Sequence, residues 1–584
     1  MCDKSAGKRV LNVNVGILGH VDSGKTSIVA ALSTQLSTAA LDKHPQSKQR
    51  GITLDLGFSS FALPMPERLA HLPYDELQFT LVDCPGHASL IRTIIGGLQI
   101  IDMMVLVVDI TKGMQTQTAE CLVVGEVATN RLVVALNKID QLHAGDEREK
   151  AVRGAIKRLT QTFTMTKFVD VNIVPVSARP DGKASNLPLG IEDLKAALVA
   201  MVPPVPRVVR GHFLFAVDHC FQIKGQGSVL TGTVLQGSIS VNEILELPAL
   251  KAMRIAKSIQ MFKTPVQRAV QGDRVGICVT QLDARLLERG LACAPGTVPT
   301  FSGAIATVEK IRFYAGRVPS HAKFHVSVGH TTVMAEMTFF GTPDGGGLSR
   351  DAALAAMVAN LNPMTPSGSP VAFDLDKDYQ YQASLLVVVQ DELYGLEGRP
   401  IRIFAAGWQM PLEAADGGNF GHFGPQWALL KFDKPVTAPK EALIIGAKFD
   451  SDVHGEACRL AFYGRLACVI DLTDSDELAR LKVYKMKIRT GSIERLQTDG
   501  TTAIVRGLLK KNSDVAAFLG LQVRVTSGRG EEGLIIGTFG KSGKLKVHFP
   551  GGIATEGRNT EDNTIMLRCK RYLFDPDTKA ALRQ

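Results

Sequence analysis

A glycine-rich loop between a short apolar run and a helix constrains this chain most. The loop reads GHVDSGKT from Gly19 to Thr26, and the run Val13 to Leu18 precedes it. The backbone N–H groups of such a loop, with the positive end of a helix behind them, form a cradle for phosphate groups. The residues expected to contact phosphate are Gly19, His20, Val21, Asp22, Ser23, Gly24, Lys25 and Thr26. Lys25 should reach the β- and γ-phosphates, and the Thr26 hydroxyl should ligate Mg²⁺.

A second motif, DCPGH, ends the apolar strand pattern Phe79 to Asp83. Asp83 can reach the magnesium shell, and Gly86 can offer its backbone N–H to a γ-phosphate. His87 then stands where an attacking water must be held, so it is the expected catalytic residue. Thr53 of the motif RGIT can give Mg²⁺ a second hydroxyl and close over the γ-phosphate. This arrangement is that of a GTPase switch, with GTP, GDP and Mg²⁺ as ligands.

Two further segments indicate guanine as the base. The motif NKID follows the strand pattern Leu132 to Leu136. Its carboxylate can accept both N1–H and the 2-amino group of guanine, a pair that adenine does not offer. Val176-Ser-Ala ends another strand pattern and fits a loop that contacts guanine O6 through its backbone. The residues expected at guanine are Asn137, Lys138, Asp140, Ser177 and Ala178.

Length and patterning predict several domains. At 584 residues, about 150 per domain suggests roughly four. From 211 onward, short β patterns separated by glycine-containing turns indicate β-barrels. The expected fold class is multidomain α/β plus β, with a P-loop GTPase domain built on a doubly wound sheet, two β-barrel domains and a C-terminal β-rich, barrel-like domain. The expected bounds are 1–205, 206–300, 301–470 and 471–584. Residues 341–425 match no continuous strand pattern and are interpreted as a surface insertion.

Charge and cysteine usage narrow the partners and the compartment. Leu481 to Gln584 holds 19 Lys and Arg against 10 Asp and Glu, which accounts for the whole net charge of +9. A basic module on a neutral body favours a polyanionic partner such as RNA. The nine cysteines form no CxxC pair, which favours free thiols in a reducing compartment. No apolar stretch is long enough to span a membrane. We expect a monomeric protein that is located in the cytoplasm. A second location in the nucleus stays an open alternative.

The C-terminal module carries the candidate RNA contacts. Its first strand pattern, LKVYKMK from Leu481, alternates apolar and basic residues. Tyr484 and Tyr572 are candidates for stacking on bases. The basic candidates are Lys482, Lys485, Lys487, Arg489, Lys510, Lys511, Lys541, Lys544, Lys546, Lys570 and Arg571.

The motifs in their order resemble the translation factors that carry aminoacyl-tRNA to the ribosome, where histidine stands at the position that Ras-like switches fill with glutamine. Longer segments are more similar to the selenocysteine-specific elongation factor family. They are Gly51 to Phe61, Val82 to Gly97, Asp109 to Glu120 and Val217 to Ile239. The likeness covers most of Arg9 to Phe340, resumes at Gln426 to Gly464, and thins in the last hundred residues.

This resemblance implies a ribosome-stimulated GTPase that delivers selenocysteinyl-tRNA at recoded UGA codons. Its implied partners are that tRNA, the ribosome, and the selenocysteine insertion RNA element or its binding protein. Asp218, His219 and Arg274 match positions of the amino-acid pocket, where a fixed cation would select the anionic selenolate over a neutral serine hydroxyl. Val21 and Ile52 resemble the apolar gate that keeps His87 from its water until codon pairing.

Other classes stay open at the level of sequence. An initiator-tRNA-binding factor of the γ-subunit type has a similar GTPase domain, but its zinc-ligand cysteines are missing here. A GTPase regulator or RNA quality-control scaffold would bind no aminoacyl-tRNA. A GTPase could also energise a metabolic enzyme such as a sulfate-activating complex.

Overall fold

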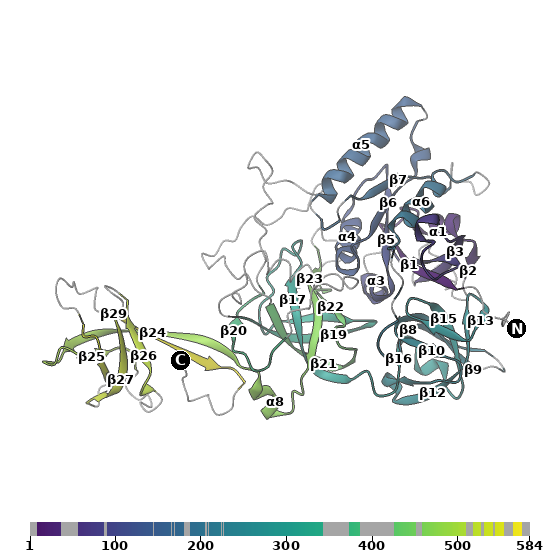
Figure 1. The fold of residues 1–584 in the computed structure, drawn as a ribbon. Coiled ribbons are helices and arrows are strands. Elements are labelled where there is room, and N and C mark those ends of the chain that lie inside the picture. The colour runs from purple at the N-terminus through teal and green to yellow at the C-terminus, as the bar shows by residue number, and fades with distance from the viewer. Residues whose placement is uncertain are drawn as a thin grey trace.

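The computed structural model places four β-rich or α/β units along the chain (Figure 1). It describes residues 9–36, 56–86, 90–143, 145–164, 166–168, 170–179, 187–204, 207, 209–223, 225, 227–342, 373–385, 426–450, 458–509, 518–526, 531–540, 543–553 and 564–574. Within these ranges no helix combines the length and apolar character needed to cross a membrane. The eight cysteines among them are free thiols.

The first unit is a seven-stranded sheet in the order β2-β3-β4-β1-β5-β6-β7. Its strands are β1 (Val10–Gly19), β2 (Gln35–Leu36), β3 (Gly57–Pro64), β4 (Glu76–Asp83), β5 (Met103–Asp109), β6 (Leu132–Asn137) and β7 (Asn172–Pro175). Its helices are α1 (Lys25–Leu32), α3 (Ile91–Gly97), α4 (Thr116–Ala128), α5 (Asp146–Phe163) and α6 (Ile191–Met201). β4, β1, β5, β6 and β7 are parallel, whereas β3 runs antiparallel to β4.

Alternation along β1 explains why helices cover both faces of this sheet. Val13, Val15 and Ile17 belong to the core that α1 and α6 complete. Leu18 belongs to the opposite core, together with side chains of α3, α4 and α5. A strand buried on both faces is typical of a parallel sheet between two helical layers. The doubly wound sheet of the sequence prediction is confirmed, with an antiparallel edge.

The second unit is a closed barrel of six strands. Its order is β11-β16-β8-β9-β15-β12, and pairing of β11 with β12 closes it, while β13 adds to β12. The strands are β8 (Leu214–Ile223), β9 (Gly227–Gln236), β11 (Ile244–Leu247), β12 (Ala252–Met261), β13 (Thr264–Val266), β15 (Arg274–Val279) and β16 (Gly290–Cys293). A separate ribbon joins β10 (Ser238–Ser240) to β14 (Arg268–Val270). Closure leaves few strand edges open.

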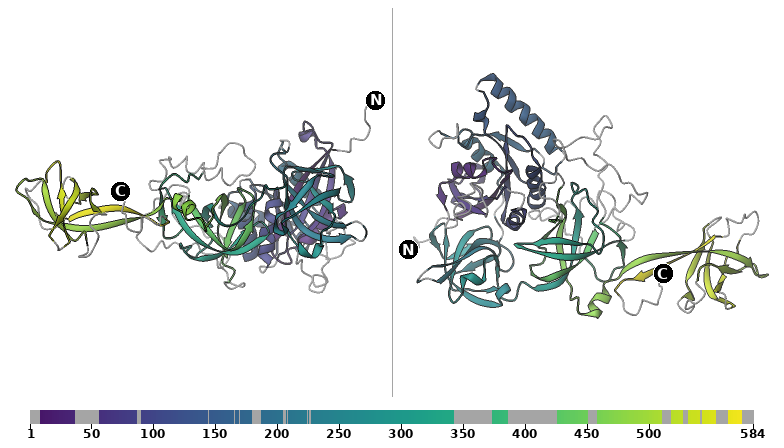
Figure 2. Two further views of the ribbon diagram at one scale, coloured as in Figure 1. Left: turned by 90° about the horizontal axis from the view of Figure 1, so that it is seen from below. Right: turned by 180° about the vertical axis from the view of Figure 1, so that it is seen from behind.

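The third unit is also a six-stranded barrel, in the order β18-β22-β23-β17-β21-β19, closed by β18 and β19. Its strands are β17 (Thr300–Lys310), β18 (Lys323–Val328), β19 (Thr331–Gly341), β21 (Gln426–Thr437), β22 (Leu443–Ala447) and β23 (Leu460–Val469). The two barrels lie side by side beneath the GTPase sheet (Figures 1 and 2). The GTPase domain therefore contacts both of them.

The fourth unit is a smaller barrel that stands away from the other three (Figure 2). A short helix, α8 (Ser475–Arg480), precedes it. Its strands are β24 (Val483–Leu496), β25 (Thr502–Arg506), β26 (Gln522–Val525), β27 (Glu532–Phe539), β28 (Lys544–His548) and β29 (Thr564–Tyr572). β24 pairs with β29 from Tyr484 to Ser492, and this two-stranded neck reaches back to the second barrel.

The interpretation of residues 341–425 as a surface insertion is wrong for part of this stretch. The stretch 341–425 contains a strand, β20 (Tyr379–Gln382), which pairs with β19 on one side and with β24 on the other. Tyr379 is 1% exposed and packs with Trp427 and Val483 in one apolar cluster. At least this part of the stretch is therefore structural, because it joins the neck to the second barrel.

Candidate functional site

The phosphate-binding loop lies between β1 and α1. Gly24 has φ 93°, and a Cβ there would lie 2.2 Å from Asn137 Nδ2, so only glycine suits this turn. Lys25 is 7% exposed and donates from Nζ to the carbonyl oxygen of His20 at 2.8 Å. Burial lowers the pKa of Lys25. A Cβ on Gly86 would lie 2.3 Å from the same Nζ, so the two motifs meet at this ammonium.

The two oxygen ligands expected for Mg²⁺ are adjacent. Thr26, at the start of α1, donates from Oγ1 to Asp83 Oδ2 at 2.7 Å. Asp83 ends β4 and is 1% exposed. A hydroxyl and a carboxylate are the oxygen donors that Mg²⁺ prefers, so these residues fit the ion. Thr53, Ile52 and His87 lie outside the described residues, and their roles stay predictions.

The guanine motifs come together through one amide. Asn137 donates from Nδ2 to the Ser23 carbonyl oxygen at 2.8 Å, and its Oδ1 accepts from the Ala178 backbone N–H at 3.3 Å. Ser177 donates from Oγ to Asp140 Oδ1 at 2.5 Å. Hydrogen bonds therefore join the phosphate loop, NKID and the Ser-Ala turn to one another.

Asp109 is a residue of this site that sequence reasoning missed. It ends β5, is 5% exposed, and pairs with Lys138 Nζ at 2.8 Å. Burial alone would raise the pKa of Asp109, but hydrogen bonds from Lys138 and Thr111 hold it below its ordinary value. The pair fixes the lysine stem, and the position of Asp109 at the end of an apolar strand was the available signal.

Two of the three predicted pocket residues are in direct contact. Asp218 occupies a bulge in β8, where the register to β9 shifts between Val217 and His219. Such a bulge re-aims the side chain it carries. Arg274, the first residue of β15, donates from Nη1 to Asp218 Oδ2 at 2.5 Å. His219 follows on β8 and is half-buried.

The GTPase domain and the second barrel each place a side chain beside the Arg274–Asp218 pair, and sequence reasoning found neither of them. The guanidinium carbon of Arg274 lies 3.1 Å from the ring centroid of Phe58, which belongs to β3 of the GTPase sheet. His330, between β18 and β19, places Nε2 3.8 Å from Asp218 Oδ1. The Arg274–Asp218 pair therefore sits where all three domains meet. No local pattern marks a contact between such distant segments.

The Arg274–Asp218 pair has a donor and an acceptor that are not used in a hydrogen bond among the described residues. Arg274 and Asp218 are 5% and 1% exposed. Among the described residues, Arg274 Nη2 and Asp218 Oδ1 are buried without a hydrogen-bond partner. Burial lowers the pKa of Arg274, and Asp218 opposes that shift. A buried donor left without a partner is costly, which makes this position a candidate for a polar or anionic ligand.

The C-terminal candidates divide into engaged and exposed residues. Tyr484 is 2% exposed, with Tyr572 and Lys570 against its ring, so its predicted role in base stacking is wrong for this arrangement. Asp378 pairs with Lys570 at 2.7 Å and accepts from Tyr572 at 2.9 Å. Lys487 and Arg571 are exposed.

The remaining basic candidates make contacts within the chain. Lys482 donates to the Asp376 carbonyl oxygen, Lys485 lies over Tyr381, Arg489 donates to the Leu508 carbonyl oxygen, Lys544 pairs with Glu494, and Lys546 lies near Phe539. Lys510, Lys511 and Lys541 lie outside the described residues. Contact with RNA stays a prediction for all of these side chains.

Comparison with known families identifies three segments. The Elongation factor Tu GTP binding domain matches residues 11–204. The third domain of eukaryotic selenocysteine-specific elongation factors matches residues 305–464, and the eEFSec C-terminal RIFT domain matches residues 479–570. The chain is 47% identical over 572 residues to the selenocysteine-specific elongation factor of Mus musculus, which covers 97% of this chain and 92% of that protein.

The chain belongs to the selenocysteine-specific elongation factor family. The selenocysteine-specific elongation factor of Methanocaldococcus jannaschii is 36% identical over 328 residues, covering 56% of this chain and 65% of that protein. The crystal structure of elongation factor SelB from Methanococcus maripaludis, solved with the GTP analogue GppNHp, has a TM-score of 0.64 at 23% identity. It covers 97% of this chain and 100% of that one, and this likeness supports the fold.

As a selenocysteine-specific elongation factor, the chain is a translational GTPase that binds guanine nucleotides, hydrolyses GTP and delivers selenocysteinyl-tRNA. Interaction with tRNA and with the ribosome follows from that membership. The initiator-tRNA factor and the regulator or scaffold are not favoured, because the domain-specific matches extend beyond the shared GTPase domain.

Proposed function

We propose that the motif residues bind the nucleotide as follows. The N–H groups from Gly19 to Thr26 surround the phosphates, with Lys25 and Gly86 at the γ-phosphate. Thr26 and Asp83 would hold Mg²⁺, with their oxygens 2.7 Å apart. When bound, Mg²⁺ would offset the negative charge of the β- and γ-phosphates. In this proposal Thr53 completes the ion shell and His87 orients the attacking water once the Val21–Ile52 gate opens.

We propose that Asp140 selects guanine, with Asn137 and Lys138 positioning the ring. The hydrogen bond from Ser177 fixes the carboxylate beside the loop that would contact O6. Asp140→Asn should weaken GTP binding by about ten- to a hundredfold, as expected on losing a hydrogen bond to a charged group. The same variant should gain affinity for xanthosine triphosphate, whose 2-oxo group needs a donor. Equal affinity of the wild type for ATP and GTP would contradict the assignment.

We propose that Arg274 and Asp218, with His219, recognise the selenocysteine side chain. A selenol is acidic enough to be an anion at neutral pH, whereas the serine hydroxyl is neutral. The observation that carries this proposal is the buried Arg274 guanidinium, whose Nη2 has no hydrogen-bond partner among the described residues. Because Phe58 covers the guanidinium in this arrangement, we infer that its ring moves aside when the amino acid enters.

The test is equilibrium binding of the GTP-bound protein to one tRNA charged with selenocysteine or with serine. Arg274→Ala should weaken the selenocysteinyl complex by about ten- to a hundredfold and leave the seryl complex nearly unchanged. Arg274→Lys should recover part of the preference, because lysine keeps the charge but not the planar fork of donors. An unchanged preference in Arg274→Ala would place selectivity in the tRNA body.

We propose that the C-terminal module couples the factor to the selenocysteine insertion RNA element or to its binding protein. Its net charge of +9 and the exposed side chains of Lys487 and Arg571 support this role. Reversing both charges to glutamate should lower UGA recoding and leave GTP hydrolysis unchanged. Lys257→Glu, an exposed change on the first barrel, is the matched control. Wild-type recoding by the reversed variant would refute the coupling.

We also propose the domain bounds 1–205, 206–300, 301–470 and 471–584, and a monomer that works in the cytoplasm. Limited proteolysis tests the bounds, because cleavage should concentrate between domains. Sedimentation at several protein concentrations tests the monomer. A mass that rises with concentration would contradict it.

A further inference from the structure

Two asparagines interrupt the apolar pattern at the start of β1. Asn12 and Asn14 are each 2% exposed, and they lie on the face of the strand opposite Val13 and Val15. Buried amides need hydrogen-bond partners. Asn12 Nδ2 donates to Asn14 Oδ1 at 3.3 Å, and the remaining partners of the two side chains come from other segments. Those partners indicate what the two amides do.

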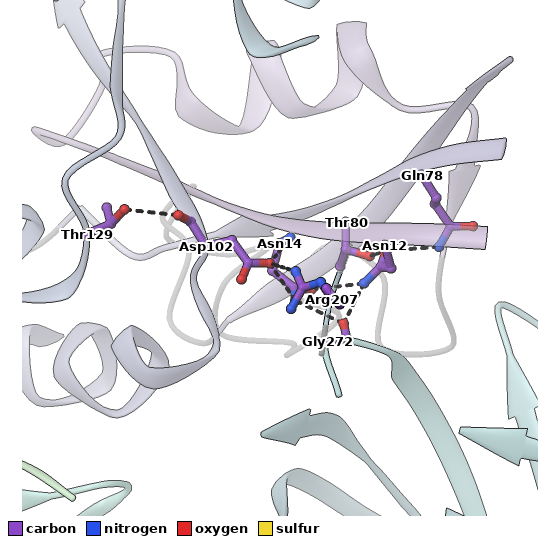
Figure 3. Close-up of polar contacts among 8 residues, drawn as sticks. All are labelled: Asn12, Asn14, Gln78, Thr80, Asp102, Thr129, Arg207 and Gly272. Atoms are coloured by element: carbon purple, nitrogen blue, oxygen red, sulfur yellow. Dashed lines mark hydrogen bonds and ion pairs between the residues drawn. The ribbon is translucent and has the colours of Figure 1, made fainter. Parts of the chain in front are cut away.

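Both side chains bind one carbonyl oxygen of the first barrel. Asn12 Nδ2 donates to the Gly272 oxygen at 2.7 Å, and Asn14 Nδ2 donates to the same oxygen at 3.0 Å (Figure 3). Gly272 precedes Arg274 by two residues, in the turn that leads into β15. The GTPase sheet thus binds the main chain next to the proposed pocket cation.

The orientation of the Asn12 amide is set by β4. Asn12 Oδ1 accepts from Thr80 Oγ1 at 2.7 Å and from Gln78 Nε2 at 3.3 Å. Since two donors from β4 occupy the oxygen side, the nitrogen side must face Gly272. Thr80 and Asp83 share this strand, so the anchoring residues and the expected magnesium ligand are built on one element.

The Gly272 turn is held from the other side as well. Its N–H donates to the Val234 carbonyl oxygen at 2.8 Å, within the barrel. Arg207, from the connection between α6 and β8, pairs with Asp102, whose Oδ2 also accepts the Asn14 backbone N–H at 2.8 Å (Figure 3). Hydrogen bonds thus hold Gly272 from β1 through its carbonyl and from the barrel through its N–H.

We propose that Asn12 and Asn14 are positioning residues for Arg274, which they fix relative to the GTPase domain through the Gly272 carbonyl. The inference rests on the proposed amino-acid pocket. β1 carries the asparagines near its first residue and Gly19 of the phosphate loop at its last. One rigid strand therefore sets the distance between the phosphate site and the turn that carries Arg274.

The experiment compares Asn12→Leu and Asn14→Leu, each of which removes one donor to Gly272 together with the bond between the two amides, and leaves the other amide on Gly272. The measured quantity is the ratio of affinities for one tRNA charged with selenocysteine and with serine, in the GTP state. Each variant should lower this ratio by roughly three- to tenfold, the effect of one lost hydrogen bond. GTP binding and thermal unfolding, measured in parallel, report that the protein is folded. If one variant does not fold, the other carries the test.

Thr129→Val is the matched control. Thr129 Oγ1 donates to the Asp102 carbonyl oxygen at 2.9 Å (Figure 3) and accepts from the Arg131 backbone N–H at 3.2 Å. Valine removes both bonds from the same network without touching Gly272. The affinity ratio of this variant should equal that of the wild type. An equal loss in Thr129→Val and the asparagine variants would mean that the network only stabilises the fold, and would overturn the inference.

Combination with Arg274→Ala separates this inference from the proposed pocket. If the asparagines act through Arg274, their substitution should not change the ratio further once Arg274 is alanine. A ratio lowered by Arg274→Ala but untouched by both asparagine variants would overturn the positioning role and leave the pocket standing. A ratio untouched by Arg274→Ala itself would overturn the pocket.

Discussion

The GTPase domain contacts the two barrels through surfaces of different chemistry. Toward the first barrel, neutral amides of β1 bind a main-chain carbonyl, and one partly exposed ion pair, Arg207–Asp102, lies beside them. Toward the second barrel, two ion pairs join full charges beside apolar contacts. Glu120 of α4 forms a bidentate pair with Arg459, at 3.1 and 3.0 Å, and both are at most 5% exposed. Glu126 of the same helix pairs with Arg312 at 2.5 Å.

The two surfaces differ in what it costs to separate the GTPase domain from each barrel. A neutral hydrogen bond to the backbone exchanges for a bond to water with little net change, so it fixes position more than it contributes energy. A buried ion pair stabilises only when it is complete, because removing one partner leaves an uncompensated charge. Both glutamates lie on α4, so a shift of this helix would disturb both pairs together. The first surface is suited to fixed placement, and the second to all-or-none docking.

The largest expected effect comes from breaking the charged surface. Arg459→Ala should lower the free energy of unfolding by about 3–5 kcal/mol, because Glu120 would stay buried without its partner. Denaturant unfolding measures this. The control is Lys323→Ala, which removes the exposed Lys323–Asp433 pair of the same barrel and should cost about 1 kcal/mol or less. Equal losses in the two variants would remove the distinction between the surfaces.

A second effect concerns the buried carboxyl of Asp273, which follows Gly272 at the surface toward the first barrel. Burial raises the pKa of Asp273 to about 6. The folded state then holds this proton more tightly than the unfolded chain, so the contribution to stability is complete below about pH 4 and is lost as the pH rises to about 6. Asp273→Asn keeps an acceptor for the Val270 N–H and should abolish this loss, on the order of 3 kcal/mol. Unfolding at several pH values checks it, and parallel curves for both proteins would refute it.

A smaller effect tests the anchor of the neutral surface. Gly272 has φ 94°, and a Cβ there would lie 2.4 Å from Arg207 Nη1. Gly272→Ala should cost about 1–2 kcal/mol in unfolding free energy, from left-handed backbone strain and displacement of Arg207. The matched control is Gly296→Ala, which has φ 70° and open space around its Cβ and so reports backbone strain alone. If Gly272→Ala lowers the free energy of unfolding no more than Gly296→Ala does, displacement of Arg207 has no cost.

The smallest effect lies on the alkaline side, at the charged surface. Burial lowers the pKa of Lys167 to about 8, and the side chain sits near Glu126 and Glu309. In the folded state this lysine loses its proton more readily, so stability should increase as the pH rises from about 8 toward 10.5. Solvent screening of the half-buried side chain limits the gain to about 1 kcal/mol. Lys167→Met should flatten this rise in an unfolding series, whereas an undiminished rise would assign it to another group.

Much of the nucleotide site could be predicted because its chemistry is local. Each motif is a short run at the end of a strand, and the strand order of the sheet brings these ends together. Barrels were predicted from residue 211 onward, since alternation marks a strand with one buried face, and strands such as β12 and β15 belong to them.

What could not be predicted depends on distant partners. β20 has four residues and exists because β19 and β24 pair with its two edges. Phe58, His330 and the two asparagines act across domain boundaries. A buried asparagine in an apolar strand pattern was a visible signal, but only the fold supplies the carbonyl that explains it.

The long strand β24 has a mechanical consequence. Its 14 residues span roughly 45 Å, with one end paired to β20 and the other inside the C-terminal barrel. The C-terminal barrel is thus connected to the second barrel by the first residues of β24, which pair with β20. In this pairing the two strands are parallel, so a pull along β24 loads the hydrogen bonds between them in shear, all at once. A sideways push loads them one after another. A longitudinal pull on the C-terminal barrel is therefore transmitted to the second barrel through bonds that share the load.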